Sequence, residues 1–392
     1  MSQLNPHISG MKCIQCGLVH ALDDYFEGCP RCLKAGTPAS VAPHYTDFPA
    51  ELNAGNIMNW LSYRGASGLG EGSTPLSSLP RLAAVLGVNA LHTKNEFCNP
   101  TGSHKDRMGA IVIQRAVDVG ATTVAVASSG NAGVSTAAYA ARAGIECVVV
   151  TTPDISPNWR RAIEMHGARI IATENPDDRW ALIARRARQG DWYPVTNSIM
   201  PPVGSNPFGV DGYRAIAFEL QLQFAAQPPT DIVVPTARGD LLWGIAKGYQ
   251  DLRDSGLVRS IPKVHAVEPF PRISLAQQGH GVVCRDYSGD TTMESIGGNT
   301  VTRQTLLALE STGGLGVAVR DEEVISDQLV LARAGLYLER SSVAALTGLR
   351  KLIDHGQIGQ DARVVMVATS HGYKEKTEFD DSLSAVDVSR EV

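Results

Sequence analysis

The sequence predicts an α/β protein with two open parallel-sheet α/β domains and a small metal-binding unit ahead of them. Three observations support this fold class. The chain has 392 residues, more than the roughly 100 to 200 residues of an ordinary domain. Apolar, strand-like runs alternate with helix-like runs in two separate series. Two C-x-x-C pairs lie close together near the start.

The first expected element is the cysteine-rich stretch of residues 11–35. Four of the seven cysteines form the pairs CIQC and CPRC, which a short hairpin-like segment joins. Zinc accepts four thiolates in a tetrahedron, and a metal can replace the core that so few residues cannot build. The alternative is four reduced surface cysteines. We expect a closed, structural zinc ribbon over residues 1–40, with the ligands Cys13, Cys16, Cys29 and Cys32.

Two series of alternating runs follow the ribbon. The first covers residues 90–172, and the second begins near residue 231 and ends with RVVMVATS, residues 363–370. Such alternation is typical of parallel sheets covered by helices. The stretch of residues 197–213 is dense in Pro, Gly and Asn, so we expect a loop between the two series.

The composition excludes several classes of function. Hydrophobic residues make up 43% and charged residues 19% of the chain, which fits a well-packed globular protein. The net charge is −5 and the basic residues are scattered, so we expect no nucleic-acid partner. Neither a signal-peptide core nor an apolar run of membrane-spanning length is present. We therefore expect a cytoplasmic protein without a membrane partner.

The segment KNEFCNPTGSHKDRMG, residues 94–109, places a turn of Asn, Pro and Gly just ahead of an expected helix. The helix begins near Lys105, where a strand ends, and this is the usual ligand crevice of open α/β sheets. Taken alone, a lysine next to Asp106 and Arg107 is more often a solvated helix start. The segment gains weight only beside the two loops that follow.

Two later loops each connect an apolar strand to a helix. The loop of Ser128, Ser129, Gly130 and Asn131 offers hydroxyls and N–H groups at a helix N-terminus, which suits a carboxylate. An ordinary, well-capped βα turn explains that loop equally well. The segment VVPTARGDLLWG can supply backbone donors to an anion, although Gly239 alone is a weak phosphate signal.

Together with EGSTPL at residues 71–76 and VATSHG at residues 367–372, these segments resemble the fold type II pyridoxal 5′-phosphate (PLP) enzymes. The resemblance is strongest to the threonine-synthase-like group and extends from about Glu71 to Lys374. It implies the fold of the tryptophan synthase β-subunit, an amino-acid substrate and a homodimer. The expected division is a large domain of residues 41–105 and 211–376, a small domain of residues 106–210, and a disordered tail of residues 377–392.

The resemblance also implies roles for individual residues. Lys105 stands where the family carries its Schiff-base lysine, and Thr369 where a threonine meets the pyridine nitrogen. Asn131 stands where an asparagine reaches the 3′-oxygen of the cofactor, within the loop that grips the substrate carboxylate. The implied phosphate-binding loop consists of Ala237, Arg238, Gly239, Asp240 and Leu241.

These residue types favour elimination or replacement at Cβ or Cγ of an amino acid. A lysine freed from the cofactor can act as general base and acid if its pKa is lowered. A neutral threonine at the pyridine nitrogen makes the cofactor a milder electron sink than a carboxylate would. A lyase of the threonine synthase type, which eliminates phosphate and adds water, is therefore the leading hypothesis.

The sequence departs from the threonine-synthase pattern in three places that surround the substrate: the segment of residues 206–212, the loop of residues 236–240, and Ala132. Gly209, in NPFGVDG, stands where the resemblance places an arginine that binds the substrate phosphate. Arg214 and Arg238 are the candidates to replace it. Two alternatives therefore stay open. One is a β-eliminating or β-replacing enzyme, such as a dehydratase, ammonia-lyase or cysteate-synthase-like protein, and the other is a non-catalytic zinc-ribbon interaction protein.

Overall fold

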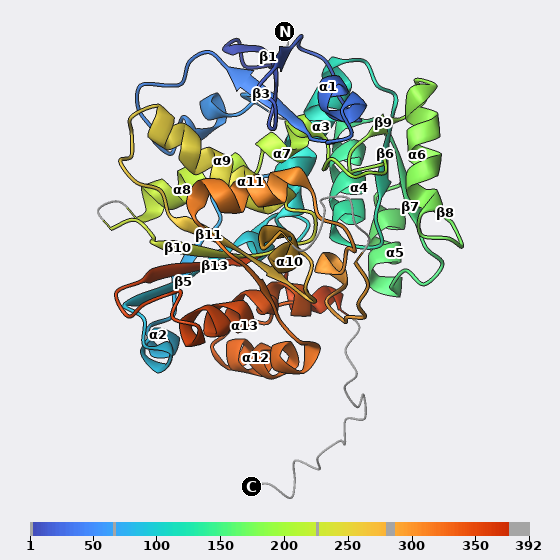
Figure 1. Ribbon diagram of the computed structural model, residues 1–392. Coiled ribbons are helices and arrows are strands. Elements are labelled where there is room, and N and C mark those ends of the chain that lie inside the picture. The colour runs from blue at the N-terminus through green and yellow to red at the C-terminus, as the bar shows by residue number, and fades with distance from the viewer. Residues whose placement is uncertain (1–2, 66–67, 225–226, 280–286, 376–392) are drawn as a thin grey trace, which may run out of the picture.

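The computed structural model describes residues 3–65, 68–224, 227–279 and 287–375. The expected disordered tail, residues 377–392, lies outside the described residues. Within them the chain forms three sheets with helices around them (Figure 1). Two of the sheets are open and largely parallel, which confirms the predicted α/β class. No described helix combines the length and the apolar character needed to cross a membrane.

The N-terminal sheet has three antiparallel strands in the order β2-β1-β3. Its elements are β1 (Ile8–Cys13), β2 (Val19–His20), α1 (Pro30–Lys34) and β3 (Val41–Tyr45). The first C-x-x-C pair lies at the end of β1, and the second lies at the start of α1. The hairpin and the short helix therefore bring the two pairs together.

The larger open sheet has six strands in the order β12-β11-β10-β13-β5-β4, and only β4 runs antiparallel to its neighbour. Its strands are β4 (Leu76–Ser78), β5 (Ala90–Asn95), β10 (Asp231–Pro235), β11 (Lys263–Glu268), β12 (Gly316–Ala318) and β13 (Arg363–Ala368). Strand β5 thus belongs to the first apolar series in the sequence but pairs with the last strand of the second series.

The smaller open sheet has four parallel strands in the order β8-β7-β6-β9. Its strands and covering helices are β6 (Thr123–Ala127), α4 (Asn131–Ala143), β7 (Glu146–Thr151), α5 (Pro157–Met165), β8 (Arg169–Ala172), α6 (Asp178–Arg188) and β9 (Tyr193–Pro194). The sheets account for the two predicted layers, whereas the exact domain boundaries stay a prediction.

The remaining helices surround the six-stranded sheet or join the two sheets. They are α2 (Pro80–Leu86), α3 (Lys105–Asp118), α7 (Pro207–Asp211), α8 (Arg214–Phe224), α9 (Asp240–Asp254), α10 (Ile273–Gln277), α11 (Arg303–Thr312), α12 (Asp321–Arg333) and α13 (Arg340–Asp354). Four 3₁₀ turns complete the described elements: η1 (Ile57–Trp60), η2 (Glu96–Cys98), η3 (Glu294–Ile296) and η4 (Gly372–Lys374).

One expectation for the fold is wrong in part. Residues 197–213 were expected to be a loop, but α7 forms within them. The side chain of Asn206 accepts hydrogen bonds from the backbone N–H groups of Phe208 and Gly209, and Pro207 occupies the first helical turn. An asparagine cap followed by proline is a helix-start signal, so the abundance of turn-forming residues misled the prediction.

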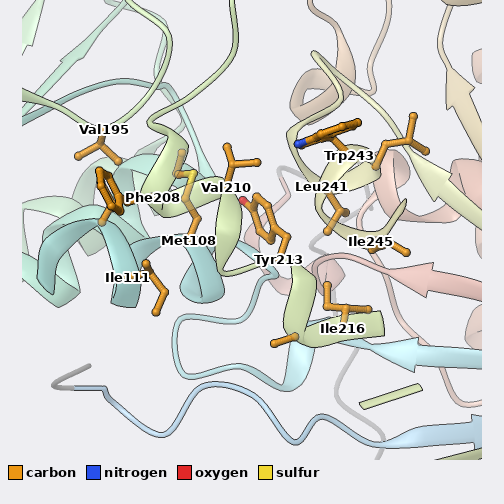
Figure 2. Packing of buried hydrophobic residues seen from close by; sticks show 14 of the residues in the cluster. Met108, Ile111, Val195, Phe208, Val210, Tyr213, Ile216, Leu241, Trp243 and Ile245 are labelled. Carbon is orange, nitrogen blue, oxygen red and sulfur yellow. The ribbon is translucent and has the colours of Figure 1, made fainter. Parts of the chain in front are cut away.

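A continuous apolar core connects α3 with the helices that follow the small sheet (Figure 2). Met108 and Ile111 of α3 pack with Phe208 of α7, Tyr213, and Leu241 of α9, all of which are buried. Burial of each large apolar side chain contributes roughly 1.5 to 3 kcal/mol. The packing therefore fixes α3, and with α3 the position of Lys105 at its first turn.

Candidate active site

A cavity of about 310 Å³ lies between the ends of the two open sheets. Its walls come from the first turn of α3, the loop after β6, the loop after β10 and the end of β13. These are carboxyl ends of parallel strands, where open α/β sheets usually bind ligands. The cavity brings together every site residue predicted for the cofactor and substrate except Arg214: Lys105, Ser128, Ser129, Gly130, Asn131, Ala237, Arg238, Gly239, Asp240, Leu241 and Thr369.

Lys105 is the first residue of α3, and it follows a turn that depends on a glycine. Gly102 has φ +78°, a conformation that favours glycine, and it lets the chain turn into the helix. The Nζ atom of Lys105 lies 5.9 Å from the ring centroid of the buried Tyr213. Burial lowers the pKa of Lys105, Arg238 lowers it further, and Asp240 opposes this. The amine is therefore closer to its neutral, nucleophilic form than a surface lysine.

The loop after β6 is held in place by the hydroxyl of Ser128. This oxygen accepts hydrogen bonds from the backbone N–H groups of Gly130 at 3.1 Å and Gly133 at 3.0 Å. Ser129 faces the other side, where its Oγ accepts a hydrogen bond of 2.9 Å from Thr151. An added Cβ at Gly130 would lie 3.4 Å from the Trp159 ring, so the loop passes close to an aromatic wall of the cavity.

The loop after β10 is built for close approach of the backbone. Gly239 has φ +79°, and an added Cβ would lie 2.2 Å from Oγ1 of Thr305. A larger residue would therefore displace the loop. The loop leads into α9, a helix of 15 residues whose N-terminus favours an anion. The carboxylate of Asp240 is engaged by Ser205, whose N–H and Oγ lie 3.1 and 2.7 Å from it.

Thr369 connects the end of β13 to the turn of residues 99–104 that precedes Lys105, called the lysine turn below. Its carbonyl oxygen accepts a hydrogen bond of 2.9 Å from the backbone N–H of His104, the residue before Lys105. Its own N–H donates to Oγ of Ser342 at 2.8 Å. The segment is therefore fixed from both sides, and Thr369 lies at the cavity wall with an exposed fraction of 3%.

Three cavity residues that the sequence analysis did not select come from the small sheet. Trp159 lies on α5, and Arg179 and Trp180 lie at the start of α6. The guanidinium of Arg179 lies 3.4 Å from Oγ of Ser129. Within the described residues, neither Arg179 nor Arg238 forms an ion pair with a carboxylate. The only signal in the sequence was an Asp-Asp-Arg-Trp run that reads as a plain helix start.

Glu339 is a further cavity residue that the sequence analysis missed. It is buried with an exposed fraction of 2%, and both of its oxygen atoms accept hydrogen bonds from Nδ2 of Asn131, at 3.3 and 3.1 Å. Burial raises the pKa of Glu339. On the other side of the amide, Nζ of Lys374 lies 2.8 Å from Oδ1 of Asn131.

Arg214 lies away from this cavity. Its side chain has an exposed fraction of 2% and forms ion pairs with Asp211 at 2.8 Å and Asp251 at 2.7 Å. It also donates to the carbonyl oxygen of Trp60 at 2.7 Å. Gly209 packs against α3, where an added Cβ would lie 2.8 Å from Cγ of Met108. The described structure therefore leaves no room for an arginine at position 209 and engages Arg214 elsewhere.

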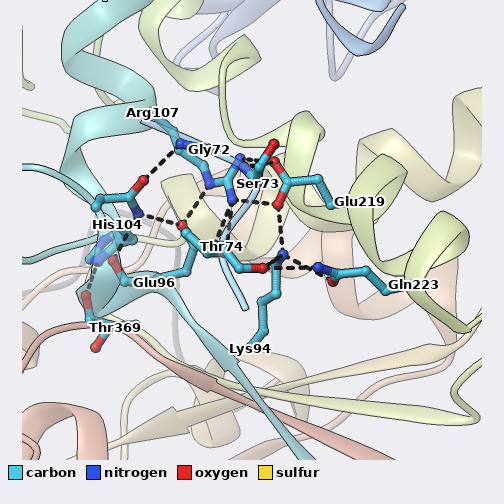
Figure 3. Close-up of polar contacts among 11 residues, drawn as sticks. Gly72, Ser73, Thr74, Lys94, Glu96, His104, Arg107, Glu219, Gln223 and Thr369 are labelled. Carbon is cyan, nitrogen blue, oxygen red and sulfur yellow. Dashed lines mark hydrogen bonds and ion pairs between the residues drawn. The ribbon is translucent and has the colours of Figure 1, made fainter. Parts of the chain in front are cut away.

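A buried network of charges supports the lysine turn from behind (Figure 3). Arg107 forms ion pairs with Glu96 at 2.6 Å and with Glu219 at 2.7 Å. Lys94 has no exposed surface and binds Glu219 at 2.6 Å and the carbonyl oxygen of Thr74 at 2.7 Å. The network therefore links strand β5, the segment before β4, helix α8 and the first turn of α3.

The four N-terminal cysteines form one cluster. Their sulfur atoms all lie within 4.8 Å of one another. The Cys13 to Cys32 distance is 3.6 Å and the Cys16 to Cys29 distance is 3.9 Å. Four thiolates at about 2.3 Å from a tetrahedral zinc ion would stand about 3.8 Å apart, so the cluster fits this metal. Nε2 of His20 lies 3.2 Å from the sulfur of Cys29, as a second layer of support.

Comparisons with known proteins agree with this geometry. Residues 68–370 match the family described as pyridoxal-phosphate dependent enzyme. The threonine synthase of Methanosarcina acetivorans is 32% identical over 93% of this chain and 92% of its own. The threonine synthase of Methanocaldococcus jannaschii is 30% identical over the same shares of the two chains.

Solved structures with lower identity share the fold. The diaminopropionate ammonia lyase of Escherichia coli has a TM-score of 0.67 and 19% identity, covering 83% of this chain and 91% of its own. The L-serine ammonia-lyase of Rhizomucor miehei has a TM-score of 0.64 and 22% identity, covering 76% and 94%. The family match over most of the chain, with near full-length relatives at 30% identity or more, shows that this chain belongs to the pyridoxal-phosphate dependent enzymes.

Proposed function

We propose that this protein is a PLP-dependent lyase of the threonine synthase type, which eliminates phosphate from a phosphorylated amino acid and adds water. One observation carries the proposal: a lysine amine with a lowered pKa faces a cavity bounded by two loops that each lead into a helix N-terminus. The near full-length similarity to two threonine synthases supports the same reaction. PLP, when bound, withdraws electrons from the substrate carbons and so makes elimination possible.

The residues of the cavity fit this cofactor. The glycine cradle at Gly239 and the N-terminus of α9 would hold its phosphate, because Gly239 has no side chain and the first backbone N–H groups of α9 can donate, while the Asp240 carboxylate is bound by Ser205. Lys105 would form the covalent link to it. Asn131 would donate to its 3′-oxygen, and the hydroxyl of Thr369 would face its pyridine nitrogen. The cavity volume of about 310 Å³ suits a small cofactor with an amino acid.

Lys105 would move the protons of the reaction. As a neutral amine it would take a proton from Cα and then from Cβ of the substrate, and as an ammonium it would deliver one to Cγ after phosphate has left and one to Cα after water has added at Cβ. Burial lowers its pKa and so makes the neutral form accessible. The loop of Ser128 to Asn131 would hold the substrate carboxylate and thereby orient Cα toward this amine.

Arg179 and Arg238 would hold the phosphate that leaves. Both line the cavity, and neither is neutralised by an ion pair within the described part of the chain. Guanidinium groups bind phosphate through charge-assisted hydrogen bonds, which are stronger than neutral ones. This pair would therefore take the place of the arginine that is missing at position 209. Arg214 cannot do so, because it forms ion pairs with Asp211 and Asp251.

A second candidate is β-elimination or β-replacement on a different amino acid, with the leaving group on Cβ in place of Cγ. The packing of Gly209 against Met108 favours it, since the family's arginine has no place there. The alternative of a non-catalytic protein loses support, because the predicted cofactor and catalytic residues meet in one cavity. A bound zinc ion in the cysteine cluster, a homodimer and a cytoplasmic location complete the proposal.

The test is a substrate comparison with the PLP-loaded enzyme. We expect threonine and phosphate to form from O-phosphohomoserine, with O-phosphoserine, serine and threonine converted at least tenfold less efficiently, a ratio that corresponds to about 1.4 kcal/mol of transition-state binding. Faster conversion of O-phosphoserine than of O-phosphohomoserine would show that the enzyme catalyses β-elimination and not γ-elimination. No turnover of any of these amino acids, in protein that binds PLP covalently, would contradict the proposed reaction.

A further inference from the structure

We infer that Lys374 is a positioning residue, whose ammonium fixes the orientation of the Asn131 amide and so decides which atom that amide offers to the cofactor. The inference rests on the proposed function, in which Asn131 donates a hydrogen bond to the 3′-oxygen of PLP. Lys374 lies in the 3₁₀ turn η4, after the end of β13, and the sequence analysis assigned it no role.

The Asn131 side chain lies between two groups of opposite charge. On one side, Nζ of Lys374 lies 2.8 Å from Oδ1, and Oγ of Ser370 lies 3.4 Å from the same atom. On the other side, the Glu339 carboxylate lies 3.1 and 3.3 Å from Nδ2, and Oγ of Ser295 lies 3.3 Å from it. The amide therefore bridges a buried acid and a largely buried base.

These partners permit only one orientation of the amide. An ammonium can only donate hydrogen bonds, so Lys374 requires the carbonyl oxygen of the amide on its side. Burial raises the pKa of Glu339, but the Asn131 hydrogen bond and the Lys374 charge oppose this and favour a carboxylate, which accepts from the NH₂ group. A flipped Asn131 would set its NH₂ group against the Lys374 ammonium and its carbonyl oxygen against the Glu339 carboxylate. Both contacts would be repulsive. The NH₂ group carries two hydrogens, so in the observed orientation one can serve Glu339, and the other, which now faces Oγ of Ser295, can turn to a ligand oxygen.

Lys374 is held in this position by the lysine turn itself. Its side chain passes over Gly102, where an added Cβ would lie 3.2 Å from Cε of Lys374. Gly102 belongs to the turn just before Lys105, so the turn that presents Lys105 also leaves the path for Lys374. Loss of the ammonium would leave Glu339 as a buried carboxylate without the positive group that faces it across the amide.

The test compares PLP binding by Lys374 variants of the full-length chain. We expect Lys374→Met to weaken the equilibrium affinity for PLP about tenfold and to shift the absorption band of the bound cofactor, as expected for losing a charge-assisted interaction. Lys374→Arg, which also can only donate, should restore most of the affinity and the band position. Lys263→Met, at an exposed lysine on β11, serves as the matched control and should leave both unchanged.

A double-mutant cycle with Asn131→Ala separates the inference from the proposed function. If Lys374 acts through Asn131, the Lys374→Met change should have little further effect in the Asn131→Ala background. Full additivity would overturn the inference while leaving the role of Asn131 intact. An Asn131→Ala variant with unchanged PLP affinity and spectrum would overturn both. Lys374→Gln, which is one atom shorter and presents an uncharged amide that can accept as well as donate, provides a second measurement if Lys374→Met loses its native circular dichroism. Wild-type affinity in Lys374→Gln would overturn the inference, because the ammonium would then not be needed.

Discussion

The guanidinium of Arg238 lies 5.1 Å from the ring centroid of Trp180, and the two residues come from segments that belong to different sheets. Arg238 precedes α9 of the six-stranded sheet, and Trp180 lies on α6 beside the four-stranded sheet. Arg179, the neighbour of Trp180, lowers the pKa of Arg238 in addition to the larger effect of burial, whereas Asp240 opposes both. Two positive groups thus line the same cavity, and an anion bound by both would relieve their repulsion.

The first prediction concerns this pair of arginines. Arg179→Met and Arg238→Met should each lower kcat/KM for O-phosphohomoserine by about 10- to 100-fold, because each removes a charge-assisted hydrogen bond to phosphate. Arg186→Met is the matched control. Arg186 lies on the same helix, and its ion pair with Asp191 is solvent-exposed, so kcat/KM should stay unchanged. Steady-state kinetics on the three variants would test this.

The assignment of the phosphate site would fail if both variants kept the kcat/KM of the wild type. A uniform loss for phosphorylated and unphosphorylated amino acids would also contradict it, because that result places the arginines at a group that all substrates share. Inorganic phosphate should inhibit the wild type competitively, and the inhibition should weaken in both variants.

The fold class was predictable because the apolar runs and the turn residues between them indicate the strands and their order along the chain. The strands β6, β7, β10 and β11 are buried on both faces, and each reads as a short apolar run bounded by turn residues. The pairing of β5 with β13 does not follow from such runs, since it joins residues about 270 positions apart. Helix α7 was missed because turn-forming residues also begin helices.

The candidate site was predictable where a loop sequence carries the chemistry. Lys105, the Ser128 to Asn131 loop and Thr369 lie in segments with a recognisable pattern, and the structure brings them to one cavity. Arg179 and Glu339 lie in helix starts without any such pattern. Their position depends on how the two sheets face one another, which a single sequence does not encode in any local signal. Arg214 was selected because it lies close to Gly209 in the sequence. The structure instead places it in buried ion pairs with Asp211 and Asp251, away from the cavity.

The second prediction concerns Lys105. Lys105→Ala should abolish turnover and the covalent link to PLP, because the only amine at the first turn of α3 is lost. Borohydride reduction followed by mass spectrometry should find no PLP-modified peptide in the variant, whereas the wild type carries the label on Lys105. Circular dichroism should be unchanged, and Lys263→Ala should behave as the wild type. A reduced PLP adduct in the Lys105→Ala protein would refute the assignment.

The third prediction concerns the cysteine cluster. We expect one zinc ion per chain, and Cys13→Ser or Cys32→Ser should lose it, whereas Cys98→Ser should keep it. The ribbon contacts the body of the protein through Asp24, which binds Arg115 of α3 at 3.1 Å and accepts a hydrogen bond of 2.8 Å from Tyr193. Loss of zinc should therefore lower the thermal unfolding midpoint, with turnover reduced but not abolished. Metal analysis without stoichiometric zinc would refute the site.

The last prediction concerns the buried charge network behind the lysine turn. Burial raises the pKa of Glu219, but the charges of Arg107 and Lys94 outweigh burial and lower the pKa to about 2. A carboxylate with a lowered pKa in the folded state contributes stability above its unfolded pKa, and this contribution is lost as the pH falls through the folded pKa. Stability should therefore decline from about pH 5 down to about pH 2, measured as the urea midpoint at each pH.

Substitutions separate this network from the other carboxylates of the protein. Arg107→Met leaves the buried carboxylates of Glu96 and Glu219 without their main partner, and it should cost about 3 to 5 kcal/mol of unfolding free energy at neutral pH. Glu219→Gln should also destabilise the protein, and its urea midpoint should depend less on pH below about pH 5, because the titrating group is gone. Arg320→Met, at an arginine whose side chain is 74% exposed, should change the stability by less than about 1 kcal/mol. An equally steep acid dependence in Glu219→Gln and the wild type would show that other carboxylates govern acid unfolding, and that this network does not.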